Sequence, residues 1–208
     1  MVFVCFDLNG TLVTNPTWLE LNAALGVTKE EDATIMRLYR EKKLSYREGQ
    51  KRLEMIYRER GKATRKNIEK ILSSYSLRPD ARETVSYLQS KNYIVAIISN
   101  SIDILVDEVG RDLHIPYAIA NNHFIFDDRG QLREIAVSDN DIHFKWKELQ
   151  QLCKKLFIKP DDCFYIGDGE DDREIFLHIK HGITFRDSSV APIAWKTIDN
   201  FINLKTIL

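Results

Sequence analysis

The sequence predicts an α/β fold built around a parallel sheet. Three short apolar runs stand apart from the rest of the chain: VFVCF at 2–6, YIVAII at 93–98 and CFYIG at 163–167. All three are rich in β-branched or aromatic residues and are apolar on both faces, which is typical of strands in a sheet covered on both sides. Helical patterns separate the runs, so we expect right-handed crossovers between parallel strands.

Two helices are expected directly before the second and third strands. One begins after Asp80, with Val85 and Leu88 on its buried face. The other precedes Cys163 and is marked by apolar residues at helical spacing, namely Trp146, Leu149, Leu152, Cys153 and Leu156. Each pattern predicts a helix that packs one face against the sheet.

Residues 15–78 interrupt the alternation because they hold helix signals and no clear strand. Capping-box patterns begin at Thr28 and at Ser45. A third helix is indicated by apolar residues at positions i, i+3, i+4 and i+7, which are Ile68, Ile71, Leu72 and Tyr75. We therefore predict a helical cap domain over 15–78 and a core domain formed by 1–14 and 79–208.

A β-hairpin is expected later in the chain. His123–Phe126 and Gln131–Val137 read as two strands, and the Gly-containing turn Asp127–Gly130 joins them.

Composition limits the possible partners. The 208-residue chain has a net charge of −1 and no strongly basic block, which argues against nucleic acid as the main partner. It holds no apolar run of about 18 residues and no signal-peptide pattern at its start, so we expect no membrane association. Cys5, Cys153 and Cys163 are not closely spaced, which favours reduced thiols in a cytoplasm. The oligomeric state is left open.

Each of the three strong strands is followed by a polar side chain. The first leads into Asp7, the second into Ser99 and the third into Asp168. Ligands of open parallel sheets bind beyond the carboxyl ends of the strands. These three residues are therefore expected to meet at one site.

The third strand runs into an acidic turn, Gly167–Asp172, at the start of a helix. Asp168, Asp171 and Asp172 would repel Asp7 unless a cation neutralised them, and oxygen ligands of this kind suit Mg²⁺. The alternative is an acidic turn that only caps the helix. A dinucleotide-binding fingerprint is excluded because Asp172 stands where the third glycine is required.

Four stretches together resemble the motifs of the haloacid dehalogenase superfamily of phosphatases. FDLNGTL (6–12) is similar to the first motif, Asp-x-Asp-Gly-Thr, and IISNS (97–101) to the second. Lys145 precedes Asp168 at a spacing that suits the third motif, with Lys147 as its competitor, and YIGDGEDD (165–172) resembles the fourth. The helical insertion resembles the C1-type cap of the phosphoserine phosphatase branch, on a Rossmann-like core.

The resemblance implies roles for the residues in these motifs. Asp7 would be the nucleophile that forms an aspartyl-phosphate. Mg²⁺ would be held by Asp7, the backbone carbonyl of Asn9 and Asp168, with Asp172 supporting its water shell. Lys145 would neutralise charge on the nucleophile and the phosphoryl group.

Substrate contacts follow from the same resemblance. Ser99 would donate a hydrogen bond to a phosphoryl oxygen, and Gly10, Thr11 and Asn100 are further predicted substrate-binding residues. Arg52 matches the carboxylate-binding arginine of the branch. Pro16 stands where the branch has an acid that meets the substrate ammonium, and Glu20 is the nearest acid. We therefore expect a small anionic phosphorylated metabolite rather than phosphoserine.

Asn9 departs from the motif. In the family, a carboxylate at this position protonates the leaving oxygen and then activates water. An amide cannot exchange a proton near neutral pH, and this help is worth roughly 10²–10⁴-fold. Asn9 would be either an engineered block of turnover or a natural feature of a degenerate relative.

The predicted function is a Mg²⁺-dependent phosphomonoesterase impaired by Asn9. The alternatives are a non-catalytic phosphometabolite-binding protein and a phosphotransferase or mutase.

Overall fold

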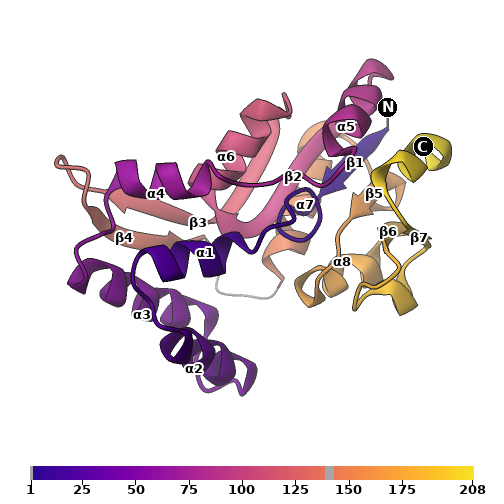
Figure 1. The fold of residues 1–208 in the computed structure, drawn as a ribbon. Helices are drawn as coiled ribbons and strands as arrows, with labels where there is room; N and C mark the ends of the chain where they lie inside the picture. Colours follow the sequence, from indigo (N-terminus) through magenta and orange to yellow (C-terminus); the bar gives the residue numbers. More distant parts are fainter. Residues whose placement is uncertain (1, 139–142) are drawn as a thin grey trace.

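A computed structural model describes residues 2–138 and 143–208. Its strands form one seven-stranded sheet in the order β4-β3-β2-β1-β5-β6-β7, with every neighbouring pair parallel except β3 and β4 (Figure 1). The strands are β1 (Phe3–Phe6), β2 (Ile94–Ile102), β3 (Tyr117–Phe126), β4 (Leu132–Val137), β5 (Cys163–Ile166), β6 (His181–Phe185) and β7 (Lys196–Ile198). The predicted α/β fold is confirmed.

The three strands expected from sequence lie side by side at the centre of the sheet. In register, Phe6 pairs with Ile97 of β2 and with Ile166 of β5. Asp7 follows directly, and its backbone N–H still donates to the Ile166 carbonyl at 2.8 Å. The carboxyl ends of β1, β2 and β5 therefore reach the same edge of the sheet.

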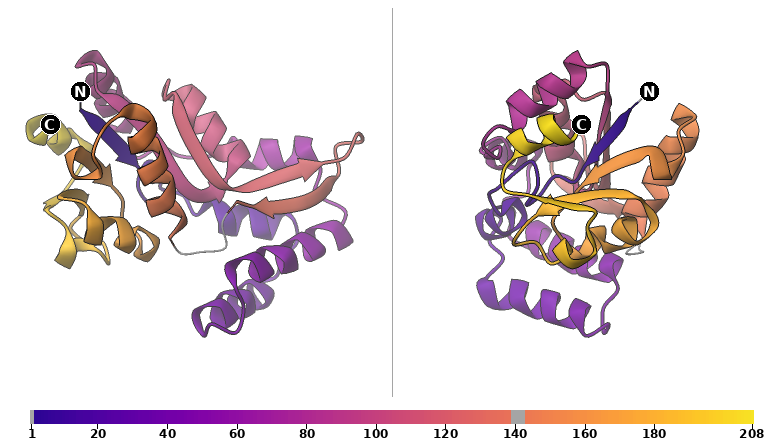
Figure 2. Two further views of the ribbon diagram at one scale, coloured as in Figure 1. Left: turned by 180° about the vertical axis from the view of Figure 1, so that it is seen from behind. Right: turned by 90° about the vertical axis from the view of Figure 1, so that its right-hand side faces the viewer.

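Helices cover both faces of the sheet and form two apolar cores. Apolar residues of α5 (Ala81–Ser90), α6 (Asp103–Asp112) and α9 (Leu204–Ile207) pack on one face, and those of α7 (Phe144–Leu156) and α8 (Arg173–His178) on the other. Figure 2 shows these layers from two further sides. The three cysteines are free and buried. Short 3₁₀ turns occupy Pro160–Asp162, Glu170–Asp172, Ala191–Ile193 and Phe201–Asn203.

The predicted insertion holds four helices, which are α1 (Thr17–Ala24), α2 (Lys29–Arg40), α3 (Tyr46–Glu59) and α4 (Arg65–Leu72). Both capping boxes are present: the Thr28 side chain accepts from the Glu31 N–H, and the Ser45 side chain accepts from the Glu48 N–H. In Figure 1, α2 and α3 project furthest from the sheet. The division into core and cap domains stays a prediction.

Helix α3 is attached to the edge strand β4. The Glu54 carboxylate accepts a hydrogen bond of 3.1 Å from the Ile135 N–H, and Arg47 donates to the Val137 carbonyl at 3.1 Å. Further along, the Leu132 N–H donates to the Ala63 carbonyl at 2.8 Å. Figure 2 shows α3 running beneath the β3–β4 hairpin. These bonds satisfy strand groups that an edge would otherwise leave open.

The hairpin expected around residues 127–130 is confirmed, since β3 and β4 pair antiparallel across this turn. Two boundaries were wrong. Strand β2 does not end at Ile98 but continues to Ile102, and β3 begins at Tyr117 rather than His123. Strands β6 and β7 were not expected. Within the described residues, no helix has the length and apolar character needed to cross a bilayer.

Candidate active site

Asp7 and Lys145 form a buried ion pair at the carboxyl edge of the sheet. Asp7 follows β1 and is 4% exposed, and its Oδ1 lies 3.0 Å from Nζ of Lys145, which is 1% exposed. Lys145 is the second residue of α7, so the first turn of that helix directs its ammonium across the ends of the strands. Two charges removed from water in this way are stable only when each has a partner.

Lys145 also joins the acidic turn to Asp7. Its Nζ lies 2.7 Å from Asp171 Oδ2 and 2.7 Å from Asp172 Oδ1. One ammonium therefore faces three carboxylates. The competitor Lys147 lies on the exposed side of α7, so the structure brings Lys145 to the acidic group.

The Asp172 carboxylate accepts hydrogen bonds from several parts of the acidic turn and its surroundings. Its Oδ2 accepts from the backbone N–H groups of Asp168 and Gly169, both at 3.0 Å. Its Oδ1 accepts from the Tyr165 hydroxyl at 2.5 Å and from Lys145. Both oxygens are thus engaged within the protein, which suits a residue that holds the turn in shape.

Asp168 lies against the turn that follows β1. The Thr11 hydroxyl donates to Asp168 Oδ1 at 2.7 Å, and the Ser188 hydroxyl donates to the Asp168 carbonyl at 2.8 Å. Gly10 has a φ of +81°, and a Cβ added there would lie 2.3 Å from Asp168 Oδ2. Only glycine combines this backbone conformation with so close an approach.

The carboxylates fit a divalent cation. Asp7, Asp168 and Asp172 offer oxygen atoms that all lie within 4.8 Å of one another. Oxygen-only donors favour Mg²⁺ over the softer transition metals. Because the oxygens of Asp172 are already bonded, Asp7 and Asp168 are the better candidates for direct contact with the ion.

Burial and mutual repulsion shift the titration of these groups. Burial raises the pKa of Asp7 well above its usual value, although Lys145 acts in the opposite direction. Burial likewise raises the pKa of Asp168 and of Asp172. Burial opposes ionisation of Lys145, but the carboxylates of Asp171 and Asp172 prevail and raise its pKa. The ammonium is therefore fully charged at neutral pH and favours ionised carboxylates around it.

Asn9 has a defined orientation. The Thr17 hydroxyl, in the first turn of α1, donates to Asn9 Oδ1 at 2.8 Å. The Asn9 side-chain nitrogen is therefore the amide atom that does not contact the Thr17 hydroxyl. Sequence reasoning did not identify Thr17, and no motif marks it.

Arg78 is a second residue that the sequence did not reveal. Its Nε donates to the Thr11 carbonyl at 2.9 Å, its Nη2 donates to the Gly10 carbonyl, and its guanidinium lies 3.9 Å from the ring centre of Phe185. Arg78 therefore fixes the backbone of the turn after Asp7. Its position just before Pro79, where the chain returns to the sheet, was the only available signal.

Ser99 and Asn100 lie within β2 at the same edge. Ser99 is buried, and Asn100 donates to Asp171 Oδ2 at 3.1 Å. A network not expected from sequence surrounds Asn100: Asn121 donates to its Oδ1 at 2.9 Å, and Asn122 and the Tyr46 hydroxyl donate to its carbonyl at 2.8 and 3.2 Å. The structure thus joins α3 to this part of the sheet.

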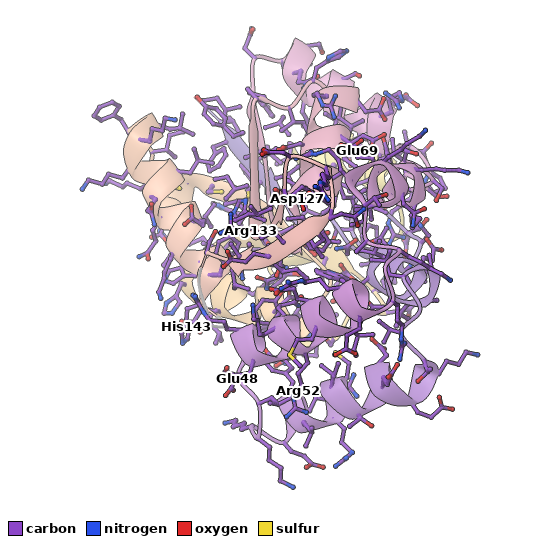
Figure 3. All side chains as sticks on the ribbon, turned by 90° about the vertical axis from the view of Figure 1, so that its left-hand side faces the viewer. Glu48, Arg52, Glu69, Asp127, Arg133 and His143 are labelled. Carbon is purple, nitrogen blue, oxygen red and sulfur yellow. The ribbon has the colours of Figure 1, made fainter. Side chains whose placement is uncertain are left out.

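Arg52 does not lie beside Asp7, Lys145 and the acidic turn. It is exposed on α3 and lines a shallow groove between α2 and α3 together with Glu30, Glu31 and Glu59. Figure 3 shows it on the side of α3 that faces α2. Glu20 is also turned away, since it accepts from the Asn15 side chain at 2.5 Å and is exposed.

Comparison with known proteins agrees with the geometry. The family model of haloacid dehalogenase-like hydrolases matches residues 2–177. The phosphoserine phosphatase of Methanocaldococcus jannaschii is 27% identical over 175 residues, which is 83% of this chain and 80% of that protein. The phosphoserine phosphatase of Archaeoglobus fulgidus is 25% identical over 211 aligned positions, covering 99% of this chain and 59% of that protein.

Solved structures give the same result for the fold. A substrate-bound phosphoserine phosphatase superposes with a TM-score of 0.79 at 25% identity, over 100% of this chain and 98% of that one. A phospho-aspartyl intermediate analogue of phosphoserine phosphatase gives a TM-score of 0.81 at 24% identity with the same coverage. With the matched motifs and the shared fold, this chain belongs to the haloacid dehalogenase-like hydrolases, in the phosphoserine phosphatase-like branch.

Proposed function

We propose that this chain is a Mg²⁺-dependent phosphomonoesterase that cleaves a small phosphorylated metabolite through an aspartyl-phosphate at Asp7. One observation carries the proposal: the Asp7 carboxylate is buried at the end of β1, 3.0 Å from the Lys145 ammonium, beside the oxygens of Asp168 and Asp172. The phosphoserine phosphatases among its relatives support the same reaction class.

The reaction follows from these positions. A carboxylate oxygen of Asp7 attacks phosphorus while the bond from phosphorus to the ester oxygen breaks. The departing alkoxide takes up a proton, and water then attacks the aspartyl-phosphate to release phosphate and regenerate Asp7. Phosphoryl transfer depends mainly on in-line positioning and on stabilising the charge of the phosphoryl oxygens.

Lys145 is the residue of this chain that would stabilise negative charge on Asp7 and on the phosphoryl group, beside any bound metal ion. Its ammonium favours ionisation of Asp7 against the effect of burial, and it lies where it can also face a phosphoryl oxygen. Asp7, Asp168 and the Asn9 carbonyl would hold Mg²⁺, with Asp172 supporting its water shell. When bound, Mg²⁺ would neutralise charge on the phosphoryl group.

Asn9 limits the rate in this proposal. Its amide can neither protonate the alkoxide nor remove a proton from water, so both steps lose a general acid–base catalyst worth roughly 10²–10⁴-fold. The second candidate function is a non-catalytic phosphometabolite-binding protein, because the Asn9 amide, whose Oδ1 accepts from the Thr17 hydroxyl, has no proton to exchange near neutral pH.

Restoring the carboxylate distinguishes the two functions. We expect Asn9→Asp to raise Mg²⁺-dependent phosphate release from a panel of phosphomonoesters by about 10²-fold or more. The double variant Asp7→Asn, Asn9→Asp is the control, and it should return to background because the nucleophile is missing. If Asn9→Asp releases no phosphate from any ester, the enzymatic proposal fails and the binding function is favoured.

A further inference from the structure

A carboxylate, an imidazole and a hydroxyl lie in line beside the β3–β4 hairpin. Nε2 of His123, on β3, lies 2.9 Å from Oγ of Ser138, the residue after β4. Nδ1 of the same ring lies 3.7 Å from Oδ2 of Asp103, the first residue of α6. The two ring nitrogens thus face a hydroxyl and a carboxylate, which is the connectivity of the serine hydrolases. None of the three residues belongs to the proposed phosphatase site.

The register of the hairpin brings His123 and Ser138 to one face. Asn122 pairs with Val137, and the Ser138 N–H donates to the Asn121 carbonyl at 2.9 Å. Ser138 therefore lies opposite Asn121, and Asn121 and His123 share a face because side chains alternate along a strand. Diagonal neighbours on one face are about 7–8 Å apart, which is within reach of an imidazole. The contact between His123 and Ser138 therefore follows from strand pairing.

Asp103 is held so that one of its oxygens is directed at His123. Its Oδ1 accepts from the backbone N–H of Ile104 at 2.9 Å and from that of Phe124 at 3.2 Å. Burial raises the pKa of Asp103, whereas these two N–H groups and His123 favour its ionised form. The carboxylate is thus fixed by the backbone, and Oδ2 is the oxygen that faces the imidazole.

This arrangement prepares Ser138 as a nucleophile. A carboxylate beside Nδ1 favours the neutral imidazole that carries its proton there, so Nε2 is left to accept from the Ser138 hydroxyl. Catalytic hydrogen bonds are often long in the absence of substrate and shorten when it binds, which suits the 3.7 Å between Asp103 and His123. Ser138 is exposed, so a small molecule reaches its hydroxyl.

Arg47 brings positive charge to the same place. Its Nη2 donates to the Val137 carbonyl, directly before Ser138, at 3.1 Å. A cation near the nucleophile favours the negative charge that develops on a carbonyl oxygen under attack. One cation gives less stabilisation than a complete oxyanion hole, so we expect activated esters to react and amides not to react.

We propose that Ser138 is the nucleophile of a second, acyl-transfer site for small activated esters of carboxylic acids, with His123 as its general base and Asp103 as the residue that positions His123. Ser138 Oγ bonds to the carbonyl carbon while its proton passes to His123 Nε2. The bond from that carbon to the ester oxygen then breaks, and the alcohol leaves with the proton. Water next cleaves the acyl-serine, which releases the carboxylic acid and restores the hydroxyl. The reaction at Asp7 takes no part in this sequence.

p-Nitrophenyl acetate is the probe for the acylation step. We expect a burst of p-nitrophenolate equal to the amount of chain, with the acetyl group on Ser138 in peptide mass spectra. Ser138→Ala should abolish the burst. His123→Gln should slow acetylation of Ser138 by at least about 10²-fold, because the general base is lost. The His123 side chain is 45% exposed and Ser138 is exposed, so both variants retain the fold.

Ser73→Ala and His114→Asn are the matched controls, because they remove exposed side chains of the same two kinds elsewhere on the surface. The burst should persist in both. Acetyl groups found only on His123 or on lysine side chains would overturn the proposal. A rate of Ser138 acetylation that is the same in His123→Gln as in the unaltered chain would also overturn it.

Asp103→Asn tests the positioning role. The amide keeps an oxygen that can accept from Ile104 and Phe124, so the Phe124 amide should keep its protection from hydrogen exchange. Without the carboxylate, ¹⁵N NMR should show the proton of neutral His123 moving from Nδ1 toward Nε2, and acetylation of Ser138 should slow by at least about tenfold. A proton that stays on Nδ1, or an unchanged rate, would exclude this role for Asp103.

Discussion

The Thr17 hydroxyl donates a hydrogen bond of 2.8 Å to the side-chain oxygen of Asn9. The hydrogen-bond partner of position 9 thus comes from α1, the first helix of the predicted cap, whereas Asn9 itself follows β1. A carboxylate at position 9 would accept the same bond, which stabilises its ionised form. The Thr17 hydroxyl of α1 therefore orients the side chain of Asn9, and it would lower the pKa of a carboxyl group placed at this position.

Removing the Thr17 hydroxyl should change the pH dependence of the Asn9→Asp variant. In that background, we expect Thr17→Val to raise the pKa of the new carboxyl, because the bond to its ionised form is lost. The acidic limb of the kcat profile should move to higher pH, and kcat should fall by about tenfold. Thr14→Val, which removes an exposed hydroxyl of the same loop, is the control. An acidic limb that does not move would exclude this role for Thr17.

Lys145 should stabilise the fold as well as serve the site. Lys145→Met leaves the carboxylates of Asp7, Asp171 and Asp172 without their shared cation, and breaking a buried ion pair costs about 3–5 kcal/mol. Urea unfolding at about pH 7 measures the loss. Lys147→Met, on the exposed side of the same helix, should change the free energy of unfolding by less than about 0.5 kcal/mol.

The penalty in Lys145→Met should depend on pH. Asp7 already has a raised pKa, so the folded chain binds more protons than the unfolded chain, and this contribution to stability is lost as pH rises through the folded pKa. Without Lys145, the pKa rises further. The loss in free energy of unfolding should therefore be larger at about pH 8 than at about pH 5. A penalty that does not change with pH would contradict this explanation.

The sequence predicted the central strands and the acidic group because both depend on local patterns. Asp7 and Asp168 each follow an apolar run, and parallel strands bring such positions to one edge whatever the rest of the chain does. The end of β2 was misplaced for a local reason too. Ser99, Asn100 and Ser101 look like a loop, yet they stay in the strand because the Asn122 side chain bonds the Asn100 and Ser101 carbonyls.

The sequence alone does not show how α3 is rotated about its own axis, and so which of its residues face the inside of the molecule. The capping box at Ser45 located the start of the helix, but it does not show which side meets the cavity of about 740 Å³ that residues of α1, α2 and α3 line. Gln50 lies toward the cavity and Arg52 toward the outer groove, a difference of two residues along one helix. That orientation is set by contacts with β4, residues far away in the chain, through Glu54.

A divalent cation should stabilise the fold through Asp168. After chelation, adding Mg²⁺ at about 100 times its Kd should raise the free energy of unfolding by about 2.7 kcal/mol. Asp168→Asn removes one negative ligand but keeps an oxygen that can accept from Thr11, so we expect most of this stabilisation to disappear without loss of the turn. Asp162→Asn, an exposed acid outside the group, is the control. Equal stabilisation of Asp168→Asn and the unaltered chain would place the ion elsewhere.

Glu54 should hold α3 against the edge of the sheet. It is 0% exposed and accepts from the Ile135 N–H. Glu54→Ala leaves that buried donor unpaired, which costs about 1–3 kcal/mol, whereas Glu54→Gln keeps an acceptor. The ion pairs with the exposed Lys51 and Arg58 add little. We expect the Ile135 amide to exchange with solvent faster in Glu54→Ala than in Glu54→Gln or in the surface control Glu59→Ala. Unchanged exchange in Glu54→Ala would show that apolar contacts alone hold the helix.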